Sequence, residues 1–103
     1  MSNPRKLVLG ADHGGFELKN ALVTWLQEAG HQVTDYGTHT SESVDYPDFA
    51  RQASIDVARG AADFGILVCT TGIGICMAAN KVSGVRAAHL TSEHQAEMTR
   101  RHN

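Results

Sequence analysis

The sequence predicts an α/β domain in three layers, built on a doubly wound parallel sheet. Short apolar runs of strand length alternate along the chain with segments whose apolar residues recur at helical spacing. Glycine, proline or polar residues stand at the junctions between these segments. Parallel strands that are joined by helices require right-handed crossovers, which place helices on both faces of the sheet.

The first half of the chain supplies two predicted strands with a helix between them. Residues 6–11 form an apolar run typical of a buried strand, and residues 32–36 form the second strand. Gly30 is expected to end the helix in the C′ position, and Gly37 begins a polar loop that extends to about residue 45. The apolar stripe of this helix consists of Leu18, Leu22, Trp25, Leu26 and Ala29.

The second half repeats the alternation of helix and strand. Residues 64–69 are the most apolar run and predict a central strand, and residues 85–90 predict a fourth strand. A helix over residues 73–81 is expected to connect them. Ahead of the central strand, Pro47 suits the first turn of another helix, whose predicted buried side consists of Phe49, Ala50, Ala53, Val57 and Ala61.

Length and composition favour one globular domain over residues 1–103, with 42% hydrophobic and 19% charged residues. A net charge of -2 gives no basic surface for nucleic acid, and no apolar run approaches the ~20 residues that span a membrane. Cys69 and Cys76 match neither a CxxC pair nor a zinc pattern, which favours reduced thiols and a cytoplasmic location.

The end of the chain departs from the pattern of a completed sheet. Ser92 and Gln95 match a capping box and predict a final helix, but that helix is polar and no strand follows it before Asn103. Since an uncovered strand edge is a liability, we expect the natural protein to continue past Asn103 and this chain to be C-terminally incomplete.

Two loops are predicted to meet where a ligand would bind. Open α/β sheets bind ligands at the carboxyl ends of strands, where the connections diverge to opposite faces. In the strand order 2-1-3-4 this point lies between the first and third strands, which end in residues 12–15 and 69–74. We expect these two loops to face each other across one crevice.

The loop over residues 70–74 could bind an anion. Gly72 and Gly74 let the backbone turn sharply at a helix start, so that N–H groups point toward a phosphate or an enediolate oxygen. A purely structural turn is the competing interpretation. The loop is not a dinucleotide fingerprint, because a third glycine is missing and the loop follows the third strand.

Cys69 is the candidate reactive group of this crevice. A cysteine at a strand end is ordinarily a small buried hydrophobe, but a helix start favours the thiolate, and Cys69 stands directly before one. Cys76 is assigned to packing inside the helix. Asp12 could simply cap the first helix, and His13 could be a surface turn residue. The remaining histidines without such a setting are expected to be structural or solvated: His31, His39, His89 and His94.

Five motifs, in matching order and spacing over essentially the whole chain, resemble the type B ribose-5-phosphate isomerases. They are Ala11-Asp12-His13-Gly14-Gly15-Phe16 with Leu18-Lys19, Asp45-Tyr46-Pro47, Cys69-Thr70-Thr71-Gly72-Ile73-Gly74-Ile75, Ala78-Ala79-Asn80-Lys81 with Gly84-Val85-Arg86-Ala87, and Arg101-His102-Asn103. Galactose-6-phosphate isomerase subunits share the fold, but the elements at Asp12 and Cys69 look more like the ribose-phosphate branch.

The resemblance implies a Rossmann-like or flavodoxin-like fold and an enzyme of the pentose phosphate pathway. The enzyme would interconvert ribose 5-phosphate and ribulose 5-phosphate through a cis-enediolate, without metal or cofactor. Cys69 would be the base, His102 would assist ring opening, and Thr71 would manage a hydroxyl proton. The residues implied to bind the substrate are Asp12, His13, Thr70, Thr71, Gly72, Ile73, Gly74 and Asn103.

Two departures from the family pattern bear on function. Thr70 stands where the family usually has glycine, which restricts the backbone of the anion loop. The family's phosphate-binding arginines lie in C-terminal helices, often across a dimer interface, and no residue here matches them by position; Arg86, Arg100 and Arg101 are expected to be solvated or structural.

A homodimer, or a tetramer, is expected for the complete protein. Two alternatives stay open beside the ribose-phosphate isomerase. One is a non-catalytic flavodoxin-like domain that binds a phosphosugar or a partner. The other is an isomerase of a six-carbon phosphosugar, allose 6-phosphate or galactose 6-phosphate.

Overall fold

The computed structural model describes residues 3–39 and 46–103. Strands and helices alternate along most of the chain as the sequence predicts, and a short 3₁₀ turn, η1, precedes the first helix. Residues 40–45, which include part of the predicted polar loop and Asp45 of the second motif, lie outside the described residues. The elements are β1 (Lys6–Ala11), η1 (His13–Gly15), α1 (Phe16–Glu28), β2 (Gln32–Asp35), α2 (Tyr46–Ala58), β3 (Phe64–Val68), α3 (Ile73–Asn80) and α4 (Glu93–His102).

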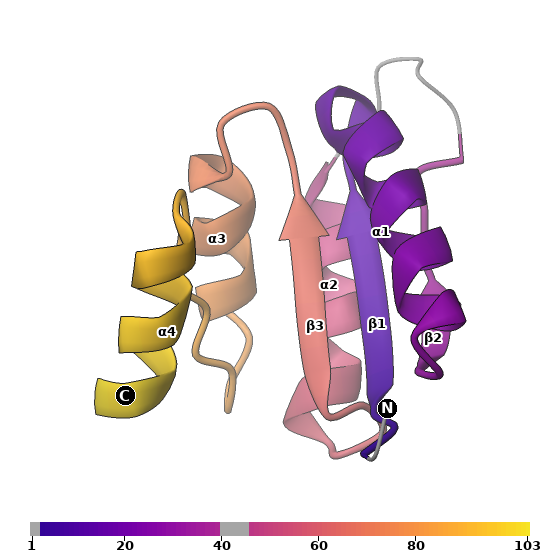
Figure 1. Ribbon diagram of the computed structural model, residues 1–103. Coiled ribbons are helices and arrows are strands. Elements are labelled where there is room, and N and C mark those ends of the chain that lie inside the picture. The colour runs from indigo at the N-terminus through magenta and orange to yellow at the C-terminus, as the bar shows by residue number, and fades with distance from the viewer. Residues whose placement is uncertain (1–2, 40–45) are drawn as a thin grey trace.

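Within residues 3–39 and 46–103, the sheet contains three parallel strands in the order β2-β1-β3. Leu9 in the central strand β1 is in register with Asp35 of β2 and with Ile66 of β3. Helix α1 covers one face of this sheet and α2 covers the other (Figure 1). The predicted three-layer, doubly wound parallel fold is therefore confirmed.

Alternate residues of β1 supply the two halves of the core. Leu7 and Leu9 pack with Leu26 of α1, whereas Val8 packs with Ala53 of α2 on the opposite face. Successive side chains of a strand point to opposite faces, so a strand covered on both sides has to be apolar throughout. This is the physical reason why residues 7–11 form one continuous apolar run.

The end of α1 is where the sequence places it. Gly30 has φ +96°, a left-handed conformation in which glycine avoids the steric cost of a side chain. Its N–H donates to the carbonyl of Gln27 at 3.0 Å, and the N–H of His31 donates to that of Leu26 at 3.1 Å. These two bonds form a Schellman motif, and they satisfy carbonyls that the helix leaves unpaired.

The predicted apolar stripe of α1 is wrong at two positions. Leu26 is buried and Leu22 packs against the core, but Leu18 is 57% exposed and Trp25 is 64% exposed. Lys19 takes a place on the buried face instead, with no exposed surface. Its Nζ lies 2.8 Å from Oδ2 of Asp35 in β2. A buried lysine is tolerated because this carboxylate compensates its charge.

The buried side of α2 also needs one correction. Ala50 and Ala53 are buried as predicted, but α2 ends at Ala58, and Ala61 is exposed. Gly60, with φ +80°, turns the chain after the helix. Ala61 therefore lies outside α2 and does not share the buried face of that helix, although the predicted helical spacing assumed that it would.

The predicted fourth strand does not form. Residues 85–90 have no strand assignment, and the sheet ends at β3 within the described residues. The side chain of Asn80, the last residue of α3, forms hydrogen bonds with both backbone groups of Ala87. The backbone groups of Ala87 are thereby occupied by a side chain in place of a neighbouring strand.

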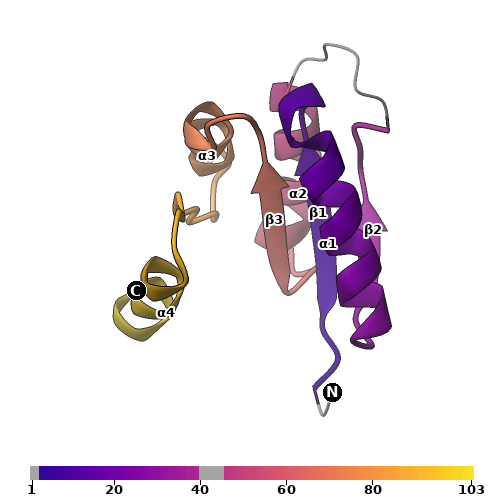
Figure 2. The ribbon, with the colours of Figure 1, turned by 45° about the horizontal axis from the view of Figure 1, so that its top comes forward.

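Helices α3 and α4 stand beside the β3 edge of the sheet (Figure 2). The predicted cap of α4 is present: Oγ of Ser92 accepts a hydrogen bond from the N–H of Gln95 at 3.1 Å. The Gln95 side chain accepts from the N–H of Thr91 at 2.8 Å, one residue before the position that a standard capping box uses. No residue of α4 is buried, in agreement with its polar sequence.

Candidate active site

The loops that follow β1 and β3 touch each other. The N–H of Asp12 donates to the carbonyl of Val68 at 3.2 Å. A methyl group on Gly14 would overlap Oγ1 of Thr70 and lie 3.2 Å from its backbone nitrogen. A methyl group on Gly15 would overlap the carbonyl of Val68. The two glycines therefore allow the close approach that brings both strand ends to one place.

Asp12 holds the first of these loops together. It is only 7% exposed, and its Oδ1 accepts a hydrogen bond from the N–H of Gly15 at 3.0 Å. This is the capping interaction that the sequence left as an alternative to substrate binding. His13, the next residue, is exposed.

The thiol of Cys69 faces the start of α3. Its Sγ accepts a hydrogen bond from the N–H of Gly72 at 3.0 Å, and Gly72 is the N-cap of that helix, with φ +80°. Oγ1 of Thr71 accepts from the N–H of Ile73 at 3.2 Å. An N–H donor and the positive end of a helix dipole both stabilise negative charge on sulfur. The backbone thus holds the sulfur of Cys69 at the start of α3.

Cys69 opens into a cavity of about 560 Å³ between β3, α3 and the segment that follows α3. Its volume lies within the range of small-molecule sites, roughly 300–1,000 Å³. The polar and charged groups around it include side chains from β3's loop, from the segment after α3 and from α4. Among them are Thr70, Thr71, His89, Arg86, Thr99 and Arg100.

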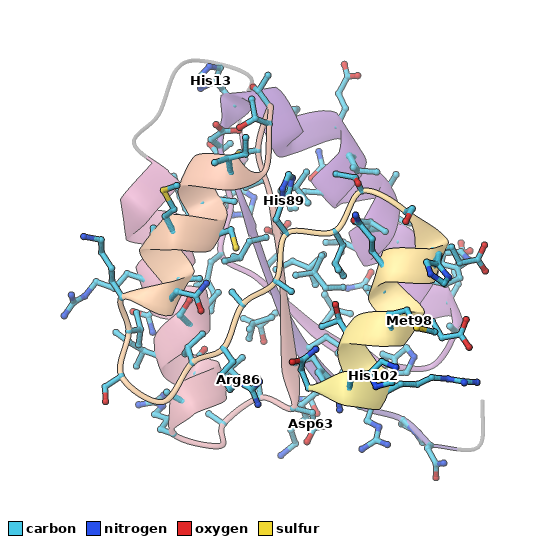
Figure 3. All side chains as sticks on the ribbon, turned by 90° about the vertical axis from the view of Figure 1, so that its left-hand side faces the viewer. His13, Asp63, Arg86, His89, Met98 and His102 are labelled. Atoms are coloured by element: carbon cyan, nitrogen blue, oxygen red, sulfur yellow. The ribbon has the colours of Figure 1, made fainter. Side chains whose placement is uncertain are left out.

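A second cavity of about 360 Å³ lies against α4 and contains the two C-terminal residues of the predicted site, His102 and Asn103. Neither residue lines the cavity of Cys69, and Asp12 and His13 line neither cavity. In Figure 3, His13 lies at the top of the molecule and His102 near the bottom, with His89 between them. The structure brings the two loops together, and it places His102 and Cys69 in the linings of two different cavities.

His89 is a residue of this region that sequence reasoning assigned to a structural or solvated role. A Cβ on Gly72 would lie 2.8 Å from both Cδ2 and Nε2 of His89, so the imidazole rests against the thiol loop. His89 also lines both cavities. One signal in the sequence could have found it: His89 stands near the carboxyl end of the predicted fourth strand, where such folds bind ligands.

The arginines have partners within the chain. Nη1 of Arg86 donates to the backbone carbonyl of Asn103 at 2.7 Å, and the guanidinium of Arg100 lies 4.9 Å from the ring centre of Phe64. Arg101 pairs with Glu97 at 3.0 Å. These contacts fit the structural role expected from the sequence, although Arg86 and Arg100 also border the cavity of Cys69.

Among the residues that the structure describes, no helix has the length and apolar character needed to cross a membrane.

Comparison with known proteins gives a consistent result. The family model described as Ribose/Galactose Isomerase matches residues 7–103. The Escherichia coli K12 protein named ribose-5-phosphate isomerase B is 46% identical over 99 residues, which cover 96% of this chain and 66% of that protein. The Pectobacterium atrosepticum protein named D-erythrulose-4-phosphate isomerase is 41% identical over 98 residues, or 94% of this chain and 64% of that protein.

A solved structure gives the same result for the fold. The Clostridium thermocellum ribose-5-phosphate isomerase B superimposes with a TM-score of 0.92 at 48% identity, over 94% of this chain and 66% of that one. The chain thus spans 64–66% of the length of these relatives.

Proposed function

Because the chain belongs to the ribose/galactose isomerase family, we propose that the whole protein interconverts ribose 5-phosphate and ribulose 5-phosphate. The resemblance to the type B enzymes that its motifs indicate is confirmed at the level of family. The observation that carries the proposal is the hydrogen bond from Gly72 to the sulfur of Cys69, at the edge of a cavity that fits a small molecule.

Cys69 would act as the base of an aldose–ketose isomerisation. Its thiolate removes the proton from C2 of the opened aldose, which leaves a cis-enediolate, and returns that proton to C1 to give the ketose. Thr71 would move the proton between the two hydroxyl oxygens. Backbone N–H groups of residues 70–74 would stabilise the enediolate oxygen, supported by the glycine-rich turn at the helix start. A well-placed general base contributes roughly 10²–10⁴-fold to such a rate.

Ring opening would use the second cavity. His102 would transfer a proton at the ring oxygen, and Asn103 would hold the ring, so the sugar would extend from Cys69 toward α4. His89, Leu90 and Thr99 line both cavities and mark the place where they adjoin. At the opposite loop, Asp12 and His13 would bind sugar hydroxyls, as the resemblance implies; Oδ1 of Asp12 also accepts a hydrogen bond from Gly15.

Ribose 5-phosphate is the proposed substrate because the 46% identical relative carries that name. The name of the Pectobacterium relative adds a four-carbon sugar phosphate to the compounds worth testing. Allose 6-phosphate and galactose 6-phosphate complete the set. The non-catalytic alternative would bind one of these compounds and convert none.

The complete protein would work as a homodimer in the cytoplasm. The dimer is what membership of the family implies, since the family's phosphate-binding arginines are expected to lie in C-terminal helices, often across a dimer interface. Cys69 and Cys76 are free thiols, as is usual in reducing compartments. Sedimentation of the complete protein as a monomer would contradict the dimer.

The central experiment measures ketose formation from ribose 5-phosphate by the complete protein. Cys69→Ala should lower kcat by at least ~10²-fold while the protein still binds the sugar phosphate. The matched control is Cys76→Ala, at the other thiol that lines this cavity, whose sulfur contacts the Ala87 carbonyl and not the start of α3; it should keep most of the activity. Activity of Cys69→Ala equal to that of the control would exclude the thiol as base. Binding without conversion by the parent protein would establish the non-catalytic alternative.

A further inference from the structure

We propose that His89 is a further substrate-binding residue of this site, whose imidazole holds an oxygen of the phosphosugar where the two cavities adjoin. The inference rests on the proposed function, since it adds one contact to the same substrate. It assigns a role to a histidine that no motif of the sequence includes.

The first step of the argument is the contact with the thiol loop. The ring atoms Cδ2 and Nε2 of His89 both lie 2.8 Å from the position that a Cβ of Gly72 would occupy. The N–H of that same glycine donates to Sγ of Cys69. Gly72 therefore touches the imidazole and the thiol, and a molecule bound against this loop meets both groups.

The second step is the position of His89 between the two cavities. Only three described residues line both of them: His89, Leu90 and Thr99. His89 is the one member of this set that can carry a charge. A sugar phosphate that extends from Cys69 toward His102 would pass along this set, so it would meet the imidazole on its way.

The third step concerns hydrogen bonding. Within the described part of the chain, neither ring nitrogen of His89 has a hydrogen-bond partner or an ion pair, and the residue is exposed. A neutral imidazole offers one donor and one acceptor, and an imidazolium offers two donors. Hydroxyl and phosphate oxygens suit both forms. Arg86 and Arg100 also line the larger cavity and contact Asn103 and Phe64, but neither lines the second cavity, so His89 is the titratable side chain at the place where the two cavities adjoin.

The test measures how well ribose 5-phosphate protects Cys69 from alkylation by iodoacetamide, followed on the Cys69 peptide by mass spectrometry. It reports binding and does not depend on turnover. His89→Leu places an apolar side chain of similar size against Gly72 and removes both ring nitrogens. His89→Gln keeps a donor and an acceptor. His94→Leu is the matched control, because His94 is an exposed histidine of α4 that lines neither cavity.

The concentration of ribose 5-phosphate that gives half-protection should rise at least about tenfold in His89→Leu, as expected for the loss of a hydrogen bond to a charged group. His89→Gln should stay within about threefold of the parent protein, because it retains both hydrogen-bonding functions. His94→Leu should equal the parent. Without ligand, the alkylation rate of Cys69 should be the same in all four proteins, since Gly72 remains in place.

Three results would overturn the inference, and they are distinguishable. If ribose 5-phosphate protects the parent and His89→Leu equally well, His89 does not bind the substrate although the proposed function stands. If ribose 5-phosphate gives no protection of the parent protein, the proposed function fails, and the role of His89 fails with it. Loss of protection in His89→Gln equal to that in His89→Leu would likewise exclude hydrogen bonding as the role.

Discussion

The side-chain amide of Asn80 forms hydrogen bonds with the backbone of Ala87 in both directions. Its Nδ2 donates to the Ala87 carbonyl at 2.9 Å, and its Oδ1 accepts from the Ala87 N–H at 2.8 Å. A neighbouring strand would use the same two backbone groups. Asn80 thereby ties the segment after α3 to the end of that helix, and the same segment brings His89 to Gly72. The geometry of the candidate site depends on this connection.

Replacing Asn80 by Ala should release the segment. Two partly solvated hydrogen bonds are lost, so we expect the free energy of unfolding to fall by about 1–2 kcal/mol. Hydrogen exchange at the Ala87 amide should accelerate, as measured by mass spectrometry or NMR. Asn20→Ala, at an exposed position of α1, provides the control and should leave that amide unchanged. Unaltered protection of Ala87 in Asn80→Ala would show that other contacts hold the segment.

Gly15 should tolerate no side chain. A methyl group there would overlap the backbone carbonyl of Val68, which cannot move without shifting β3 against β1. We expect Gly15→Ala to lower the free energy of unfolding by about 2 kcal/mol or more through this overpacking. Urea denaturation measures the change.

Gly65→Ala is the matched control for that experiment. Gly65 lies in β3, and the nearest atom to an added Cβ would be 3.4 Å away, at Cγ2 of Val57. We expect a change below about 1 kcal/mol, since alanine also restricts the unfolded chain more than glycine. Equal effects of the two substitutions would mean that the loops do not pack as closely as the structure indicates.

The ion pair of the buried Lys19 with Asp35 should contribute to the free energy of unfolding. Removing the ammonium with Lys19→Ala leaves the Asp35 carboxylate without its cation and leaves a void under α1, so we expect a loss of about 3 kcal/mol. Lys81→Ala, at an exposed lysine, should change the free energy of unfolding by less than about 0.5 kcal/mol. A loss in Lys19→Ala no larger than in this control would mean that the pair contributes nothing.

Ionisation of Tyr36 should lower the free energy of unfolding at alkaline pH. Its hydroxyl donates to Oδ2 of Asp56, and this bond, together with burial and the charge of that carboxylate, raises the pKa of Tyr36 above its ordinary 10.0. Ionisation is therefore less favourable in the folded state than in the unfolded state. The contribution is fully present below about pH 10 and is lost as the pH rises through the folded pKa.

The comparison of the parent protein with Tyr36→Phe isolates this effect. The parent should be the more stable protein near neutral pH, and urea denaturation at increasing pH should show the difference shrinking above about pH 10. Tyr36→Phe leaves every other titratable group in place, so the contributions of those groups cancel in the comparison. A difference that stays constant between about pH 8 and 11 would contradict the raised pKa.

Local pattern determined most of the secondary structure of this protein. The continuous apolar run of residues 7–11 identified a strand buried on both faces, and Gly30 identified the end of α1. Ser92 identified the start of α4 through its side chain. The order of these elements, together with the rule that parallel strands bind ligands at their carboxyl ends, predicted that the loops after β1 and β3 would meet. Each of these inferences depends on residues close together in the sequence or on a general topological rule.

Tertiary structure alone decided the remaining features, because each depends on a partner from a distant part of the chain. Lys19 can be buried because its ammonium pairs with the carboxylate of Asp35 in β2. The apolar spacing of α1 cannot predict this pair, since Asp35 belongs to another element. Residues 85–90 stay out of the sheet while Asn80 holds Ala87, although their apolar pattern is that of a strand. The contact of His89 with Gly72 follows from this path of the backbone. The spacing of apolar residues indicates which face of a helix or strand is buried. Which side chain compensates a buried charge or binds a backbone group depends on residues that come together only when the chain has folded.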